Sequence, residues 1–126
     1  SAGNNGRDID RQPVYPAALQ LPNMIVVTSS ENDGRLAQGS NWGASSVDIM
    51  VPGERIAVTD HRGAPGKASG SSFAVPRVTA LAVRLLAKHP EWRGPELRQA
   101  ILARARPVAE RLVRYGWIPD PSDGPD

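Results

Sequence analysis

The stretch Ser69-Gly70-Ser71-Ser72-Phe73-Ala74-Val75-Pro76 leads from small residues and hydroxyls directly into an apolar pattern with the period of a helix. Pro76 lacks an N–H, which a helix tolerates only near its start. The apolar positions that follow recur three and four residues apart, at Val78, Leu81, Ala82, Leu85 and Leu86. The sequence therefore predicts a buried helix from about Ser72 to Lys88, with Ser72 at its amino end.

A serine at a helix start has two interpretations. The first N–H groups of a helix have no acceptor inside the helix, so beside a hydroxyl they can hold a developing oxyanion. The small residues around Ser72 also let other groups approach it closely, which is typical of a nucleophile. The alternative is an N-cap hydroxyl that only satisfies the first turn of the helix. This stretch alone leaves both interpretations open.

The composition limits the class of protein. A chain of 126 residues with 40% hydrophobic content has the size of one domain. The absence of cysteine excludes disulfides, a thiolate nucleophile and cysteine-ligated metal sites. The net charge is only +2, and the basic residues of 77–114 are spaced as on a solvated helix face, so no nucleic acid is expected. No apolar run is long enough to cross a membrane. Three scattered tryptophans are expected to pack with their indole N–H bonded: Trp42, Trp92 and Trp117.

The remaining pattern predicts strands and a second helix. Short β-branched runs predict strands at residues 23–29, 47–51 and 55–59, and residues 63–70 are expected to form a flexible approach to Ser72. A helix is predicted from Gly94 to about Ala105. Strands followed by helices indicate an α/β fold, part of a larger sheet with helices packed on it. We expect one folded unit over residues 1–118 and a flexible tail over residues 119–126.

Several segments, taken in order, resemble the subtilisin-like serine proteases, or subtilases. Residues 69–76 are similar to the family's S-G-T-S-M/F-A-x-P nucleophile motif, with Ser71 in place of the commoner Thr. Ala2-Gly3-Asn4-Asn5-Gly6 is similar to its A-G-N-x-G segment. Further pieces match in the family's order up to about residue 118: Tyr15-Pro16-Ala17, Ile25-Val26-Val27, Ser40-Asn41-Trp42-Gly43, Asp48 with Pro52-Gly53, and Lys88-His89-Pro90-Glu91-Trp92. Each piece is weak alone, but their order and separations together are specific.

The resemblance implies a fold, an activity and site residues. The fold is the carboxyl-terminal part of a three-layer α/β/α subtilisin-like domain with a mostly parallel sheet. The activity is hydrolysis of peptide bonds through an acyl-enzyme at Ser72, which favours the nucleophile interpretation of that residue. The Ser72 N–H and the Asn4 side chain would bind the oxyanion, and Ala2 and Gly3 would form a wall of the pocket for the substrate side chain before the cut bond. For Asn4, a turn residue bonded to its own backbone is the alternative.

The resemblance also bears on cofactor and compartment. It favours a secreted or cell-envelope protein, and it allows calcium. The residues themselves indicate no metal site, because Asp48 is a single carboxylate in a strand and lacks the convergent oxygens that calcium requires.

The family's catalytic Asp and His motifs precede the oxyanion Asn, and neither occurs in this chain. A serine hydroxyl is a poor nucleophile until a neighbouring base takes its proton. We therefore expect the first part of the catalytic domain to lie upstream of Ser1, and the isolated chain to be inactive. The pair Asp60-His61 is a poor substitute for the missing catalytic Asp and His, because adjacent residues of an extended segment point to opposite sides.

Two kinds of partner are expected. One is a peptide or protein substrate, and the other is the missing amino-terminal part of the domain. An exposed sheet edge would also favour a homo-oligomer. A different class of function is a non-catalytic binding or assembly module that keeps the half-fold as a scaffold. The upstream sequence distinguishes the two classes, since only the protease needs an intact Asp and His.

Overall fold

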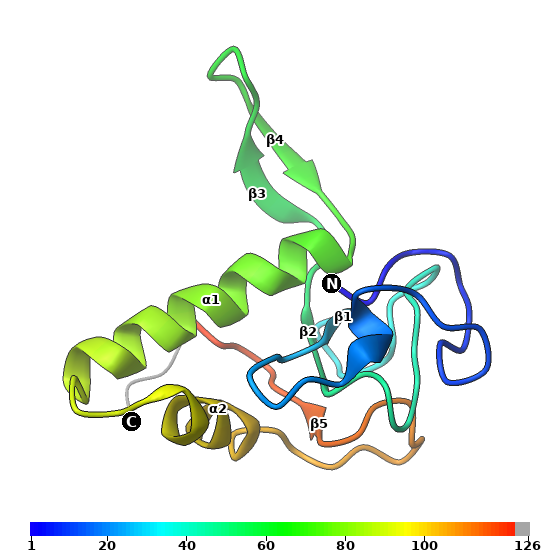
Figure 1. Ribbon diagram of the computed structural model, residues 1–126. Helices are drawn as coiled ribbons and strands as arrows, with labels where there is room; N and C mark the ends of the chain where they lie inside the picture. The colour runs from blue at the N-terminus through cyan, green and yellow to red at the C-terminus, as the bar shows by residue number, and fades with distance from the viewer. Residues whose placement is uncertain (123–126) are drawn as a thin grey trace.

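The computed structural model describes residues 1–122, and Figure 1 shows a small sheet with helices packed along it. The sheet has three parallel strands in the order β1-β2-β5. A separate antiparallel hairpin is formed by β3 and β4. The elements are η1 (Ala17–Leu19), β1 (Val27–Ser30), β2 (Ile49–Pro52), β3 (Ile56–Thr59), β4 (Pro65–Ala68), α1 (Ser71–Lys88), α2 (Gly94–Leu102) and β5 (Gly116–Trp117). The predicted α/β class is confirmed.

Two clusters of buried apolar side chains pack on the two faces of the sheet. Side chains alternate between the two faces of a strand, so Val27, Ile49 and Val51 point toward the helices. There they pack with Leu81 and Leu85 of α1 and with the end of α2. The opposite face, which includes Met50, packs against the amino-terminal loops and η1. Because α1 packs over one face of β1 and β2, its first residues lie at the carboxyl ends of these strands.

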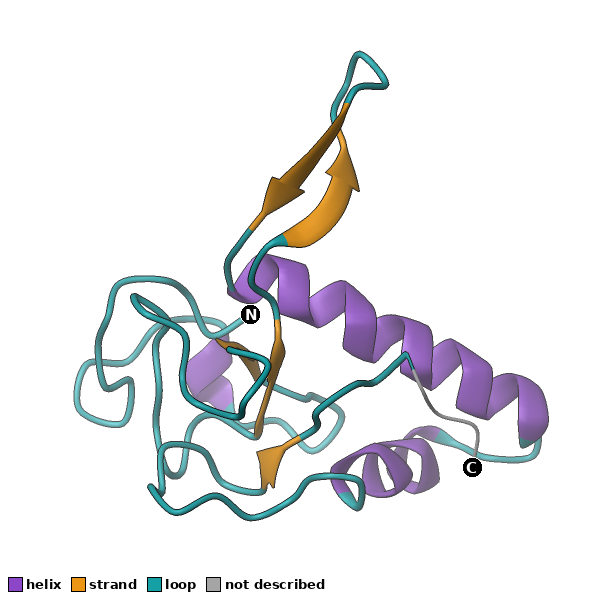
Figure 2. Ribbon diagram, turned by 180° about the vertical axis from the view of Figure 1, so that it is seen from behind, coloured by secondary structure: helices purple, strands orange, loops and turns teal. Residues whose placement is uncertain are grey.

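The β3–β4 hairpin corrects one expectation. Residues 63–70 were expected to form a flexible approach, yet residues 65–68 pair with β3 in register from Ile56↔Ala68 to Thr59↔Pro65. The hairpin projects from the body of the protein (Figures 1 and 2). Its turn is closed by the Asp60 carboxylate, which accepts hydrogen bonds from the N–H groups of Arg62 and Ala64, and by Gly63 at φ +82°. An Asp-x-x-Gly turn of this kind was the signal in the sequence.

Other boundaries also differ from expectation. The first strand begins at Val27 rather than residue 23, because the Val26 N–H is bonded to the Asp48 side chain. The second helix ends at Leu102 rather than Ala105, and β5 was not predicted because it has only two residues. The indole N–H of Trp117 is buried without a partner among residues 1–122, so the expectation that it is bonded was wrong.

The predicted tail begins with four described residues, two of which bond to α1. Asp120 pairs with Arg77 at 2.9 Å, and the buried Pro121 accepts a hydrogen bond from Arg84 through its carbonyl oxygen. Residues 123–126, the rest of the predicted tail, lie outside the described residues. Within residues 1–122 no helix has the length and apolar character needed to span a bilayer.

Candidate active site

The two serines that open α1 have different surroundings. Ser71 is the first residue of the helix and is fully buried, whereas Ser72 is exposed. Gly70, at φ +138°, turns the chain from β4 into the helix. An L-residue rarely adopts this backbone conformation, which accounts for glycine at this position. Of the two hydroxyls, only that of Ser72 is accessible to a molecule in solution.

The Asn4 carboxamide lies at the start of α1. Its Oδ1 accepts hydrogen bonds from the backbone N–H and the hydroxyl of Ser71, each at 3.0 Å. A backbone N–H can only donate, so the oxygen of the carboxamide must face Ser71 and the Nδ2 must point elsewhere. The bonds reach 67 residues along the chain rather than to a neighbouring turn. The structure thus brings the Asn4 side chain to Ser71, the residue before Ser72. Within the described residues, Asn4 does not bond to its own backbone, as the alternative interpretation of it as a turn residue expected.

A buried asparagine shapes the loop that carries Asn4. The Nδ2 of Asn41 donates to the Ala2 carbonyl at 2.9 Å, and its Oδ1 accepts from the N–H groups of Asn5 and Arg7 at 2.9 and 3.0 Å. Gly3 stands at φ +98°, and a Cβ there would lie 2.7 Å from the Asn41 Nδ2. Sequence reasoning included Asn41 only as one letter of a matching segment and missed this role. The signal was a polar residue between Ser40 and Trp42 in a compact loop.

The first turn of α1 leaves the Ser72 N–H available. The Ser71 N–H donates to Asn4 and the Phe73 N–H donates to the Gly70 carbonyl. The Ser72 N–H between them has no acceptor within the part of the chain that the structure describes. Partial positive charge gathers at the amino end of a helix, which favours an anion there. This arrangement is chemically suited to stabilising negative charge next to the Ser72 hydroxyl.

The two residues expected to line a substrate pocket differ in exposure. The Ala2 side chain is fully buried in the second core cluster, and its N–H donates to the Val27 carbonyl at 2.9 Å. Gly3 is partly exposed, and its N–H donates to the Ser71 hydroxyl at 3.2 Å. Of this pair, only Gly3 borders solvent. Their role as a pocket wall stays a prediction.

Neither histidine of the chain is placed to act as a base for Ser72. His89 follows the last residue of α1, and 17 residues at about 1.5 Å each separate it from Ser72 by about 25 Å. His61 lies in the turn of the projecting hairpin, the end away from α1 (Figure 1). The carboxylate of Asp60 next to it is occupied by backbone N–H groups.

Asp48 acts as a buried network partner. Its Oδ2 accepts a hydrogen bond from the Val26 N–H at 2.8 Å, and its Oδ1 lies 3.6 Å from the Arg98 guanidinium. Burial raises the pKa of the Asp48 carboxyl, against the opposing effects of the Val26 N–H and of the charges on Arg98 and Arg114. Within residues 1–122 no three His, Cys, Asp or Glu side chains gather as metal ligands would. Calcium, which only the resemblance allows, stays an untested expectation.

The raised pKa predicts a pH dependence for Asp48→Asn. On raising the pH from about 4 to about 7, the unfolded chain loses the Asp48 proton before the folded protein does, so this group lowers the free energy of unfolding of the wild type. The amide keeps an acceptor for Val26 and does not titrate. We expect the stability of the variant relative to wild type to increase over this range in urea titrations. A difference that stays constant or decreases would contradict the prediction.

Comparisons with known proteins found relatives in sequence and in structure. A model of the subtilase family, Peptidase_S8, matches residues 1–117. Subtilisin E of Bacillus subtilis is 34% identical over 106 residues, which are 83% of this chain and 27% of subtilisin E. A subtilisin-like protease of Coccidioides posadasii is 45% identical over 88 residues, covering 69% of this chain and 21% of that protein. The solved structure of the patellamide maturation protease PatA matches with a TM-score of 0.77 and 31% identity, over 92% of this chain and 45% of that one. The chain thus spans less than half the length of each of these proteins.

Proposed function

The chain belongs to the subtilase family, the subtilisin-like serine proteases, and from this premise we propose that it carries the nucleophile and the oxyanion-binding groups of a serine endopeptidase. One observation supports the assignment most directly. The Asn4 carboxamide is fixed by its oxygen to Ser71, the residue before the exposed Ser72, which leaves its Nδ2 available as a donor. A donor held at its other end by the neighbour of a nucleophile has little freedom to reorient, which is the condition for preorganised stabilisation of charge.

The proposed reaction is acyl transfer to water. The Ser72 Oγ attacks the peptide carbonyl carbon as its proton passes to a histidine base. The carbonyl oxygen becomes negatively charged and accepts hydrogen bonds from the Ser72 N–H and the Asn4 Nδ2. The C–N bond then breaks, and the leaving amine takes the proton from the base. Water, deprotonated by the same base, hydrolyses the Ser72 ester and regenerates the hydroxyl.

In this proposal the base and the Asp that orients it come from a segment outside residues 1–126. Three features of the chain support a covering segment. The sheet order β1-β2-β5 leaves one edge of β1 without a partner strand among residues 1–122, although the N–H groups of Ala2 and Ala37 bond to the Val27 and Ser29 carbonyls there. An apolar groove of about 310 Å³ lies between β1, α1 and α2. On α1, Val83 and Leu86 lie one helical turn apart and are 63% and 41% exposed.

A fluorophosphonate probe, which forms a covalent adduct with activated serines, tests the proposal. In the full-length protein that includes the base-bearing segment, we expect labelling on the peptide that contains Ser72. Residues 1–126 alone, in which both histidines lie away from Ser72, are expected to give no labelling and no peptide hydrolysis.

Two results would count against this. Labelling of residues 1–126 alone would refute the need for an external base. A folded full-length protein without labelling, and without Asp and His in its upstream segment, would favour the non-catalytic module instead. Light scattering of residues 1–126 further shows whether the isolated chain forms a homo-oligomer, as an exposed sheet edge would favour.

A further inference from the structure

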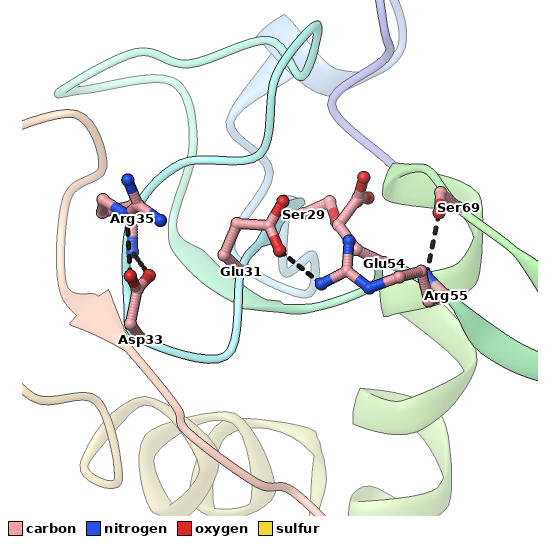
Figure 3. Close-up of polar contacts among 7 residues, drawn as sticks. All are labelled: Ser29, Glu31, Asp33, Arg35, Glu54, Arg55 and Ser69. Atoms are coloured by element: carbon pink, nitrogen blue, oxygen red, sulfur yellow. Dashed lines mark hydrogen bonds and ion pairs between the residues drawn. The ribbon is translucent and has the colours of Figure 1, made fainter.

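A chain of contacts joins the end of β1 to the turn before Ser72 (Figure 3). Arg55 lies in the turn between β2 and β3. Its guanidinium Nη2 is 2.7 Å from the Glu31 carboxylate, and its backbone N–H donates to the Ser69 hydroxyl at 2.8 Å. One residue thus binds the loop that follows β1 with its side chain and the nucleophile turn with its backbone.

The backbone of Arg55 is in an unfavourable conformation. Its φ is +54°, in the left-handed region that residues with a Cβ avoid. Such a conformation persists only where surrounding contacts hold it. The ion pair with Glu31 is one such contact, and the preceding residue is held too, because the Ser29 hydroxyl donates to the Glu54 carboxylate at 2.7 Å. Glu54 and Arg55 therefore each bind a residue at the end of β1 or directly after it.

The same turn also touches the residue before α1. The Gly70 N–H donates to the Gly53 carbonyl at 3.0 Å. A Cβ on Gly53 would lie 2.9 Å from the Gly70 oxygen and 2.9 Å from the Ala74 Cβ, so the two segments are in close contact. A displacement of the Arg55 backbone would therefore be transmitted to Ser69 and Gly70. Ser72 follows two residues after Gly70.

We propose that Arg55, held in its left-handed conformation by Glu31, is a positioning residue that sets the Ser69–Gly70 turn and through it the Ser72 hydroxyl. The inference rests on the proposed function, since it assigns Arg55 a role in the acylation step. Arg55 does not itself touch the reacting atoms. Displacing a reacting group by a fraction of an ångström slows the bond-forming step and leaves the binding of substrate elsewhere intact.

The test uses the full-length protein and peptide hydrolysis measured as kcat and KM. We expect Glu31→Gln to lower kcat by about fivefold, with KM changed by less than about twofold. Arg55→Ala, which keeps a Cβ at positive φ and loses the ion pair, should give a similar loss. The double variant Glu31→Gln with Arg55→Gly should recover kcat to within about twofold of wild type, because glycine adopts positive φ without the ion pair.

The neighbouring pair Asp33–Arg35 supplies a matched control. It is also an exposed arginine–carboxylate pair at 2.7 Å, drawn in Figure 3, but neither member contacts residues 69–72. Asp33→Asn and Glu31→Gln should change the melting temperature by similar small amounts, since exposed ion pairs contribute little to stability. Only Glu31→Gln should lower kcat.

Three outcomes would overturn the inference while leaving the proposed function intact. The first is labelling of Ser72 with a kcat of Glu31→Gln equal to that of wild type. The others are a loss of kcat in Asp33→Asn as large as in Glu31→Gln, and no recovery of kcat in the double variant Glu31→Gln with Arg55→Gly. If the wild type itself is neither labelled nor active, the proposed function fails first.

Discussion

Ser72→Ala in the full-length protein is expected to lower kcat for peptide hydrolysis by about 10⁶-fold, a scale taken from the nucleophile of subtilisin itself. The reason is that no other hydroxyl stands in its place. Ser71 is fully buried and its Oγ is bonded to Asn4, so it cannot reach a substrate carbonyl. Alanine is a good helix residue and Ser72 is exposed, so the variant should fold with unchanged melting temperature.

Ser71→Ala is the matched control for this prediction. It removes a hydroxyl that supports Asn4, so it should reduce the rate without abolishing it, and the fluorophosphonate adduct should still be found on Ser72. Mass spectrometry of the labelled peptide separates the two serines. An adduct on Ser71, or residual hydrolysis by Ser72→Ala within about tenfold of wild type, would show that the nucleophile has been assigned to the wrong residue.

The second large effect is expected at Asn4. Both Asn4→Ala and Asn4→Asp should lower kcat by about 10²–10³, again a scale known from subtilisin itself, with little change in KM. The aspartate variant is the sharper test. It keeps an oxygen to accept from the Ser71 N–H, so the helix start stays anchored, but it replaces the Nδ2 donor by an acceptor that repels an oxyanion.

Stability measurements separate the two roles of Asn4. Asn4→Ala leaves the N–H and the hydroxyl of the buried Ser71 without their acceptor and should cost about 1–2 kcal/mol in the free energy of unfolding, whereas Asn4→Asp should cost less. If Asn4→Asp kept near-normal kcat, Asn4 would be an anchor for Ser71 only, and the oxyanion role would be refuted. If both variants lost kcat in proportion to stability, local unfolding would be the simpler explanation.

Much of this chain could be predicted from local pattern. The helix at Ser71–Lys88 follows from its apolar spacing, and the strands at β1, β2 and β3 follow from short β-branched runs. The hairpin partner β4 was missed because Pro65-Gly66-Lys67-Ala68 has poor strand propensity and pairs only because the Asp60–Gly63 turn returns the chain along β3. β5 was missed because two residues carry no periodicity.

The sequence by itself determined the family, the start of α1 and the two polar residues that mark the candidate site, because each depends on residue types at fixed local spacing. Only the tertiary structure decided how those residues are held. Asn4 meets Ser71 across 67 positions, Asn41 shapes the loop between Ala2 and Arg7, and Arg55 joins Glu31 to Ser69. Such contacts depend on how the sheet and α1 bring distant segments together, and hydrogen bonds of this kind leave no periodic trace in the sequence.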